Sequence, residues 1–196
     1  MVSKVSIGRR KKEIKKRSNQ TQTHSSKKKV LLKTKEKKKS YNKRFEKIKE
    51  IVQKEKGMNS YFIMKRLERV ENFCGVYSID NLPVLQNYPA YLVVNLSPEN
   101  SQGSHWIALR VEHSKIEVFD SLKLKKYPKE LTDFFGDRKK YFYKRIQSDS
   151  SFYCGFFVCF FVIFRSLYSL KTTTSFFSKT LAENDQLLLN KLSQIW

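Results

Sequence analysis

The most constraining feature of the sequence is an apolar segment in its last third, residues 152–167, with the sequence FYCGFFVCFFVIFRSL. A helix formed by this segment is apolar on all sides and must be surrounded by the rest of the fold. The segment contains Arg165, and it is shorter than the ~18–20 apolar residues expected of a membrane span. We therefore expect residues 153–167 to form the buried central helix of a globular domain.

Shorter apolar runs predict the elements around this helix. Short runs rich in β-branched and aromatic residues indicate strands, and apolar residues three or four positions apart indicate helices. The expected strands are residues 91–96, 105–112, 115–119 and 141–146, and the other expected helices are residues 61–67, 128–135 and 184–195. Strands combined with a buried helix predict an α/β or α+β domain.

Positive charge is concentrated at the N-terminal end. The first 57 residues contain 22 Lys and Arg against 5 Asp and Glu, so they carry +17 of the net charge of +22. The remaining residues carry only +5, from 18 Lys and Arg against 13 Asp and Glu. Such asymmetry favours a polyanion as partner, most often DNA.

The chain is expected to divide where this charge ends. Residues 1–40 have few apolar side chains and cannot form a core, so we expect them to be disordered. Residues 40–56 suit a basic amphipathic helix. We therefore predict a basic arm over residues 1–57 and a folded domain over residues 58–196.

Cysteine usage bears on the compartment. The chain has three cysteines, Cys74, Cys154 and Cys159, and no apolar signal segment at its N-terminus. An odd number of cysteines without a signal favours free thiols in a reducing, intracellular compartment.

Cys154 is the candidate nucleophile. It stands before Gly155 at the start of the expected central helix, where free N–H groups and the helix dipole favour a thiolate and can bind an oxyanion. Gly155 leaves room for a substrate backbone. A buried structural thiol is an equally good interpretation of this position when it is taken alone.

His105 and Asp120 are the candidate base and orienting acid. His105 opens one expected strand and Asp120 ends the next. If these strands form a hairpin, the start of one lies beside the end of the other, and the two side chains are neighbours. A carboxylate beside the imidazole would fix its tautomer. Taken singly, a structural histidine and a turn-forming aspartate remain the alternatives.

Gln147, seven residues before Cys154, completes the candidate site, because its side-chain amide can donate a hydrogen bond to an oxyanion. An ordinary loop glutamine is the alternative.

A metal site is not expected, since Cys154 and Cys159 lie on different helix faces and only His105 is a candidate nitrogen ligand beside them.

Three segments carry these residues in the order His, Asp, Gln, Cys: GSHWIALRV, IEVFDSL and QSDSSFYCGFFVCFF. They resemble the adenovirus-type (adenain-like) cysteine proteases, which are related to the SUMO-deconjugating proteases. The seven-residue separation of Gln147 and Cys154 is similar to that of the adenoviral type. The segment FCGVYSIDNLP, the strand YLVVNLSPEN and the pair Asn184-Asp185 resemble the proteases of Polinton-type transposons and related DNA viruses.

The resemblance implies a papain-like arrangement on a domain with a central mixed sheet and a buried nucleophile helix. It also implies a thiol endopeptidase that cleaves structural precursor proteins during capsid maturation, in the host nucleus and the virion. Two departures stand out. Asp120 replaces the glutamate of the adenoviral enzyme, and no cysteine lies between Asp120 and Cys154 to hold a disulfide-linked activating peptide.

The expected partners are precursor proteins as substrates and DNA through the arm; a membrane is not an expected partner, and a monomer is expected. No cofactor is expected to be required, with DNA or an activating peptide left open as stimulators. Two alternatives remain. One is a SUMO- or ubiquitin-like isopeptidase with the same triad, and the other is a non-catalytic DNA-binding relic.

Overall fold

The computed structural model describes residues 43, 46, 50 and 58–196 of the chain. By its internal contacts the chain divides into two units, residues 1–44 and 45–196. The expected disordered arm and amphipathic helix lie outside the described residues, except that Lys43, Glu46 and Glu50 are helical and exposed. The second unit carries all the elements described below.

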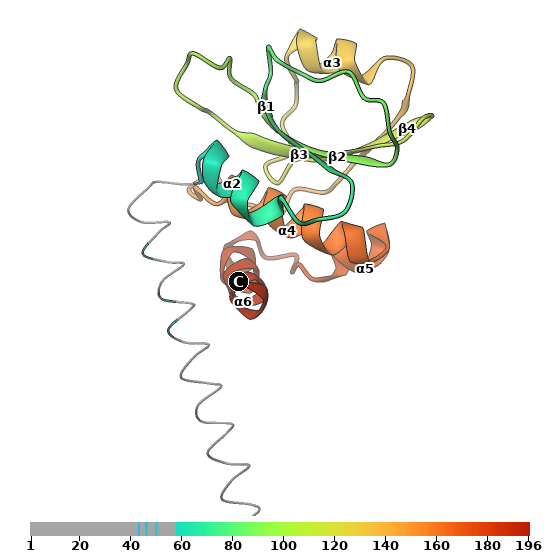
Figure 1. Ribbon diagram of the computed structural model, residues 1–196. Helices are drawn as coiled ribbons and strands as arrows, with labels where there is room; N and C mark the ends of the chain where they lie inside the picture. The colour runs from blue at the N-terminus through green and yellow to red at the C-terminus, as the bar shows by residue number, and fades with distance from the viewer. Residues whose placement is uncertain (1–42, 44–45, 47–49, 51–57) are drawn as a thin grey trace, which may run out of the picture. The chain divides into compact units, whose positions relative to one another are not determined.

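A five-stranded mixed sheet forms the centre of this unit (Figure 1). Its strands lie in chain order and are β1 (Phe73–Ser78), β2 (Ala90–Asn95), β3 (Trp106–Val111), β4 (Lys115–Phe119) and β5 (Lys139–Phe142). β2, β3 and β4 are antiparallel neighbours, whereas β1 and β5 run parallel to the strand beside them. The expected mixed sheet is therefore confirmed.

Five helices accompany the sheet in the part of the chain from residue 58 onwards. They are α2 (Ser60–Leu67), α3 (Lys129–Phe135), α4 (Cys154–Leu167), α5 (Leu170–Ser175) and α6 (Leu181–Ile195). α3 covers one face of the sheet, and α2 and α4 lie on the other, with α6 beyond α4 (Figure 1). This combination of a mixed sheet and helices is an α+β fold.

The alternation of β2 explains the two layers. Successive side chains of a strand point to opposite faces. Tyr91 and Val93 belong to the core shared with α4, whereas Leu92 and Val94 belong to the core beneath α3. The strand is buried on both faces along its whole length, which is why it appears in the sequence as an unbroken apolar run.

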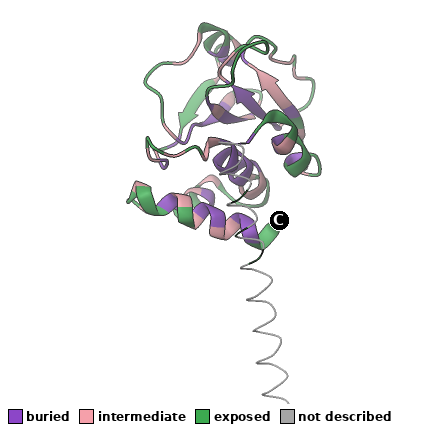
Figure 2. Cartoon of the chain, turned by 90° about the vertical axis from the view of Figure 1, so that its left-hand side faces the viewer, coloured by how far each residue is buried: buried purple, intermediate pink, exposed green. Residues whose placement is uncertain are grey.

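The apolar segment forms α4, the most deeply buried helix of the described unit. Its residues from Gly155 to Val162 are all buried, and the burial colouring of Figure 2 shows the contrast with α6, which alternates between buried and exposed positions up to the C-terminus. In the described part of the chain, no helix combines the length and apolarity needed to cross a membrane.

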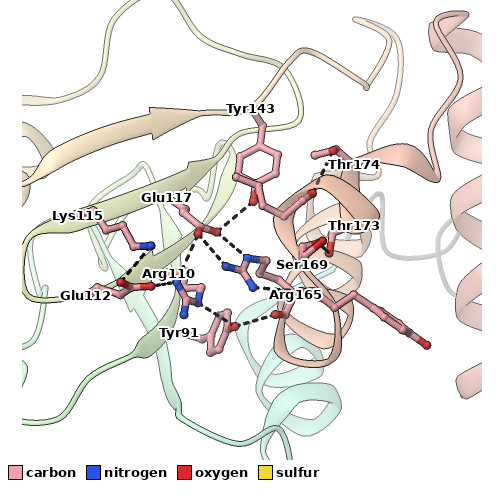
Figure 3. Close-up of polar contacts among 12 residues, drawn as sticks. Tyr91, Arg110, Glu112, Lys115, Glu117, Tyr143, Arg165, Ser169, Thr173 and Thr174 are labelled. Atoms are coloured by element: carbon pink, nitrogen blue, oxygen red, sulfur yellow. Dashed lines mark hydrogen bonds and ion pairs between the residues drawn. The ribbon is translucent and has the colours of Figure 1, made fainter.

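A buried ionic network fastens the C-terminal end of α4 to the sheet (Figure 3). Arg165 makes two hydrogen bonds to the Glu117 carboxylate, of 2.8 and 2.9 Å. Tyr143 and Arg110 donate to the same carboxylate at 3.2 and 3.3 Å. The hydroxyl of Tyr91 donates to the backbone carbonyl of Arg165 at 3.0 Å. Glu117 is only 3% exposed, so these partners compensate the cost of removing its carboxylate from water.

Candidate active site

The β3–β4 hairpin places His105 beside Asp120. The two strands pair antiparallel, with Ala108 opposite Phe119, so the start of β3 lies beside the end of β4 and His105 and Asp120 are diagonal neighbours. His105 Nε2 lies 2.7 Å from Asp120 Oδ1. The His105 carbonyl accepts the Leu96 N–H at 2.9 Å, which fixes its backbone to the end of β2. The predicted hairpin and the predicted neighbourhood of the two side chains are confirmed.

Asp120 is 2% exposed and accepts four hydrogen bonds. Besides His105, the donors are the N–H groups of Leu122 (3.0 Å) and Leu124 (2.7 Å) and the hydroxyl of Tyr127 (2.9 Å). Burial alone would raise the pKa of the carboxyl, but these bonds outweigh it and the pKa of Asp120 is lowered. The carboxylate is therefore ionised at neutral pH and holds the imidazole through Nε2.

The other ring nitrogen of His105, Nδ1, remains for Cys154. Burial of the imidazole would lower its pKa, but the bond to Asp120 and the neighbouring Cys154 side chain raise the pKa of His105 to about 9. His105 is thus protonated at neutral pH. An imidazole beside a thiol can exchange a proton with it, which is the arrangement that nucleophilic cysteines use.

Cys154 is the first residue of α4 and is partly exposed. No side chain of the described residues caps the first turn of this helix, so its free N–H groups remain available to another acceptor. Cys159, further along α4, is fully buried, and burial raises the pKa of its thiol. The two thiols therefore have opposite environments, as a nucleophile and a core residue require.

Gly155 serves a different contact from the one expected. A Cβ atom at this position would lie 2.7 Å from the Cβ of Met58, so the space beside Gly155 is filled by Met58 and not left for a substrate backbone. The Met58 carbonyl also accepts the indole N–H of Trp106 at 2.9 Å. Met58 thereby connects the start of α4 to the start of β3.

Gln147 is buried and held at both ends of its amide. Its Oε1 accepts the Ser121 hydroxyl at 2.5 Å, and its Nε2 donates to the Ser151 carbonyl at 2.7 Å. The backbone N–H of Gln147 donates to the Ser121 carbonyl at 3.0 Å. An amide nitrogen carries two hydrogens, so Nε2 retains one for a further acceptor.

His105, Gln147 and Cys154 line one cleft of about 770 Å³. Asp120 lies behind His105 and does not line it. The end of β1 and residues 97–104 form other parts of its wall. A cleft with a thiol, an imidazole and a side-chain amide on its walls can bind a polypeptide carbonyl and attack it.

Three hydroxyl residues of this region were not predicted from the sequence. Tyr127 holds Asp120, Ser121 holds Gln147 through both its side chain and its backbone, and Ser151 accepts from Gln147. Only the position of Ser121, directly after Asp120, offers a signal, because a residue at a strand end next to a site residue is poised to contact the site. Among the described residues, no group of three or more His, Cys, Asp or Glu side chains could hold a metal ion.

No family model matches the chain, and no curated protein matches it. The α+β fold and the site geometry are therefore the basis for a functional assignment, together with the motif resemblance.

Proposed function

We propose that this protein is a cysteine endopeptidase with a papain-like catalytic arrangement. Cys154 is the nucleophile, His105 the general base and acid, Asp120 the orienting acid and Gln147 an oxyanion donor. The observation that carries the proposal is the Asp120–His105 pair on the hairpin, with the imidazole lining the same cleft as the thiol at the start of α4.

In the first half-reaction, the Cys154 thiolate attacks the scissile carbonyl carbon. The oxygen becomes an oxyanion and accepts hydrogen bonds from Gln147 Nε2 and from the N–H groups that open α4. His105 then transfers its Nδ1 proton to the leaving nitrogen, the C–N bond breaks, and the C-terminal product departs with its new amino group. A thioester on Cys154 remains.

In the second half-reaction, His105 is neutral and takes a proton from a water molecule. The resulting hydroxide attacks the thioester, the C–S bond breaks, and the carboxylate product leaves. Asp120 keeps the imidazole in one tautomer throughout, because its carboxylate accepts from Nε2 in both steps.

The substrate class comes from the motif resemblance. We propose structural precursor proteins of a virus or transposon as substrates, cleaved during capsid maturation in the host nucleus and virion. The cleft of about 770 Å³ is large enough to hold a polypeptide segment. The high charge of residues 1–57 supports DNA as a second partner.

The chemistry is tested first by alkylation with iodoacetamide at pH 7, with mass mapping of the modified thiols. Cys154 should react and Cys159 should not, since it is fully buried. Replacement His105→Ala should slow the alkylation of Cys154 by about tenfold or more, because an unassisted thiol is only roughly a few per cent thiolate at this pH. An unchanged rate in the folded variant would contradict the pairing of His105 with Cys154.

Substrate cleavage is tested by incubating the protein with the structural proteins encoded beside it and mapping the cuts by mass spectrometry. We expect cuts with the wild type and with Cys159→Ala, and none with Cys154→Ala. Ubiquitin and SUMO fusions are included as competing substrates. Cleavage of these alone would favour the isopeptidase alternative, and cleavage of nothing, with an unreactive Cys154, would favour the non-catalytic alternative.

A further inference from the structure

The end of β2 lies beside the segment that leads into His105, and Asn95 is the residue at which the two meet. Asn95 is the last residue of β2 and pairs with Trp106, the first residue of β3. The next residue, Leu96, donates its N–H to the His105 carbonyl at 2.9 Å. Asn95 and His105 both line the cleft, so the Asn95 side chain belongs to the wall that carries the candidate base.

The oxygen of the Asn95 amide is used within the protein. Oδ1 accepts the N–H of Ser97 at 2.9 Å and the N–H of Ser104 at 3.3 Å, and it thereby closes the segment of residues 97–104 at both ends. Both partners are N–H donors, so the oxygen must face them. The NH₂ group of the amide therefore points away from these two bonds.

This NH₂ group is an unused donor. Among the described residues, Asn95 Nδ2 has no hydrogen-bond partner, although Asn95 is only 8% exposed. A buried amide without a partner costs folding free energy, and native proteins rarely retain one. Nδ2 is not sealed inside the protein, because the fully buried unpartnered side-chain atoms of the described residues are Asp185 Oδ1 and Trp196 Nε1. A molecule in the cleft can therefore accept a hydrogen bond from Nδ2.

Gly103 keeps this donor uncovered. A Cβ atom on Gly103 would lie 2.9 Å from Asn95 Nδ2, so the missing side chain leaves space for an acceptor at hydrogen-bond distance. The φ angle of Gly103 is not positive, so the conformational freedom of glycine does not explain its presence. Gly103 also lines the cleft. The two residues together form an open donor site on the cleft wall.

The surroundings of the donor site select its ligand. An anion such as phosphate would need cationic partners, and among the described residues no Lys or Arg lines the cleft. The Asn95 amide is neutral, and it suits a neutral acceptor such as a backbone carbonyl. A polypeptide in the cleft presents one carbonyl per residue.

We propose that Asn95 is a substrate-binding residue, whose Nδ2 donates a hydrogen bond to a backbone carbonyl of the polypeptide in the cleft, and that Gly103 leaves the space for this carbonyl. Asn95 stands on the His105 wall, whereas the oxyanion donors Gln147 and the start of α4 belong to another part of the chain. The carbonyl bound by Asn95 is therefore not the scissile one. Its role in hydrolysis rests on the proposed function, and the donor site itself rests only on the geometry of Asn95 and Gly103.

Two variants remove the donor in different ways. Asn95→Asp keeps an oxygen for the N–H groups of Ser97 and Ser104 but replaces the NH₂ group by a second oxygen. Gly103→Ala keeps the amide, adds no charge and places a methyl group against Nδ2. Gly103→Ala also decides the question if the buried charge of Asn95→Asp prevents folding. Asn87→Asp is the matched control, because Asn87 is exposed and does not line the cleft.

The first measurement requires no hydrolysis. Cys154 is labelled with two tri-alanine probes, one ending in a chloromethyl ketone and one beginning with a chloroacetyl group, so that the peptide extends from the reactive carbon in either direction. Chloroacetone and chloroacetamide provide the reference rates. For at least one probe, the ratio of the probe rate to the reference rate should fall about two- to tenfold in both variants, as loss of one hydrogen bond predicts. The double variant should show no further loss, because both changes remove the same bond. Unchanged ratios for both probes would overturn the donor site.

The second measurement uses a peptide that spans a cut mapped in the structural proteins. Both variants should raise KM by about the factor found with the probes and change kcat less than about twofold, because the bond is the same in the ground state and the transition state. Asn87→Asp should match the wild type. A fall of the reference labelling rates in both variants would indicate damage to the His105–Cys154 pair and would overturn the binding role.

The outcomes distinguish the donor site from the proposed function. If the wild type hydrolyses no peptide while the labelling ratios fall in both variants, the proposed function fails and the donor site is supported. If the wild type hydrolyses the peptide and neither variant changes KM, the donor site fails and the proposed function is supported.

Discussion

Asp120 illustrates how one residue can organise a site. Its two carboxylate oxygens accept two backbone N–H groups, one hydroxyl and the imidazole. The three bonds other than that to His105 hold the carboxylate in one orientation before any substrate arrives. This arrangement makes the orientation of His105 a property of the folded domain, which is what preorganised catalysis requires.

Replacement of Asp120 by asparagine should show how far the rate of peptide cleavage depends on this orientation of His105. In Asp120→Asn, the amide can present its NH₂ group to His105 and stabilise the wrong tautomer, so the rate of peptide cleavage should fall by up to about 10⁴-fold. The measurement is kcat/KM on a peptide substrate together with far-UV circular dichroism. A rate within about threefold of wild type in a folded variant would mean that Asp120 does not orient the base.

The Asp120–His105 pair predicts how the free energy of unfolding varies with pH. The pKa of His105 in the folded protein, about 9, lies above its ordinary value of 6.5. The contribution of His105 to the free energy of unfolding is therefore complete below pH 6.5 and is lost as pH rises through 9. The pKa of Asp120 is lowered, so its contribution requires a pH above the ordinary carboxyl range. Urea unfolding should therefore show the largest difference between wild type and Asp120→Asn near pH 6 and a smaller difference at pH 10. A constant difference would contradict the ion pair.

The sequence could predict site residues whose type is rare in the chain, or whose place follows from a neighbouring strand or from the spacing to Cys154. Cys154 and His105 were candidates because few residues of their types are present, and Asp120 followed from the hairpin. Tyr127 and Ser151 gave no signal, since hydroxyl residues are common in loops and only the tertiary fold brings these two to their partners.

At the scale of elements, prediction succeeded where burial dominates. The β3–β4 hairpin and α4 were predicted almost at their observed bounds, because apolar periodicity is strong there. β1 was missed, since Gly75 has a φ of 143° and the register shifts beside it. α5 was missed because its Thr-rich sequence has low helix propensity. β5 was expected over 141–146 and lies over Lys139–Phe142; its four residues are exposed.

The anchoring of α4 at its C-terminal end predicts a strong dependence of stability on Glu117. Glu117→Gln leaves Arg165 and Arg110 without their shared carboxylate, and breaking a buried ion pair from one side costs about 3 kcal/mol or more. Urea unfolding of the variant measures this loss.

Two variants provide controls for this loss. Glu130→Gln removes an exposed charge from α3 and should change the free energy of unfolding by less than about 0.5 kcal/mol. The pair Glu117→Leu with Arg165→Met should recover much of the loss, because apolar side chains of similar volume replace buried ion pairs well. A loss as small for Glu117→Gln as for Glu130→Gln would contradict the anchor.

At the scale of the whole molecule, the charge of residues 1–57 predicts DNA binding without sequence preference. We expect replacement of the basic clusters by Gln at residues 9–12, 15–17, 27–29 and 37–39 to abolish most of the affinity. Each lost phosphate contact should also reduce the slope of log K against log salt by about 0.9. Cleavage of a short peptide should be unchanged, since the candidate catalytic residues lie between His105 and Cys154.

The control for this experiment replaces the exposed domain residues Lys125 and Lys126 by Gln. Equal losses of DNA affinity in both variants would assign binding to the domain. Substitution within the full chain is preferable to removal of residues 1–57. A chain beginning at Met58 would place a charged amine next to a residue that contacts both Trp106 and Gly155.

The contacts of α6 with the loop of residues 146–152 also set an order in time. Ribosomes release a chain from its N-terminus at about 5–20 residues per second, so the residues of α6 emerge a few seconds after Cys154. Until they do, the core beside α4 lacks Leu188, Leu189 and Leu192, and the Ile146 carbonyl lacks its hydrogen bond from Asn184. Under the proposed function, the protein would therefore stay inactive while it is being translated, and would cut neither its own unfinished chain nor its neighbours on the same messenger.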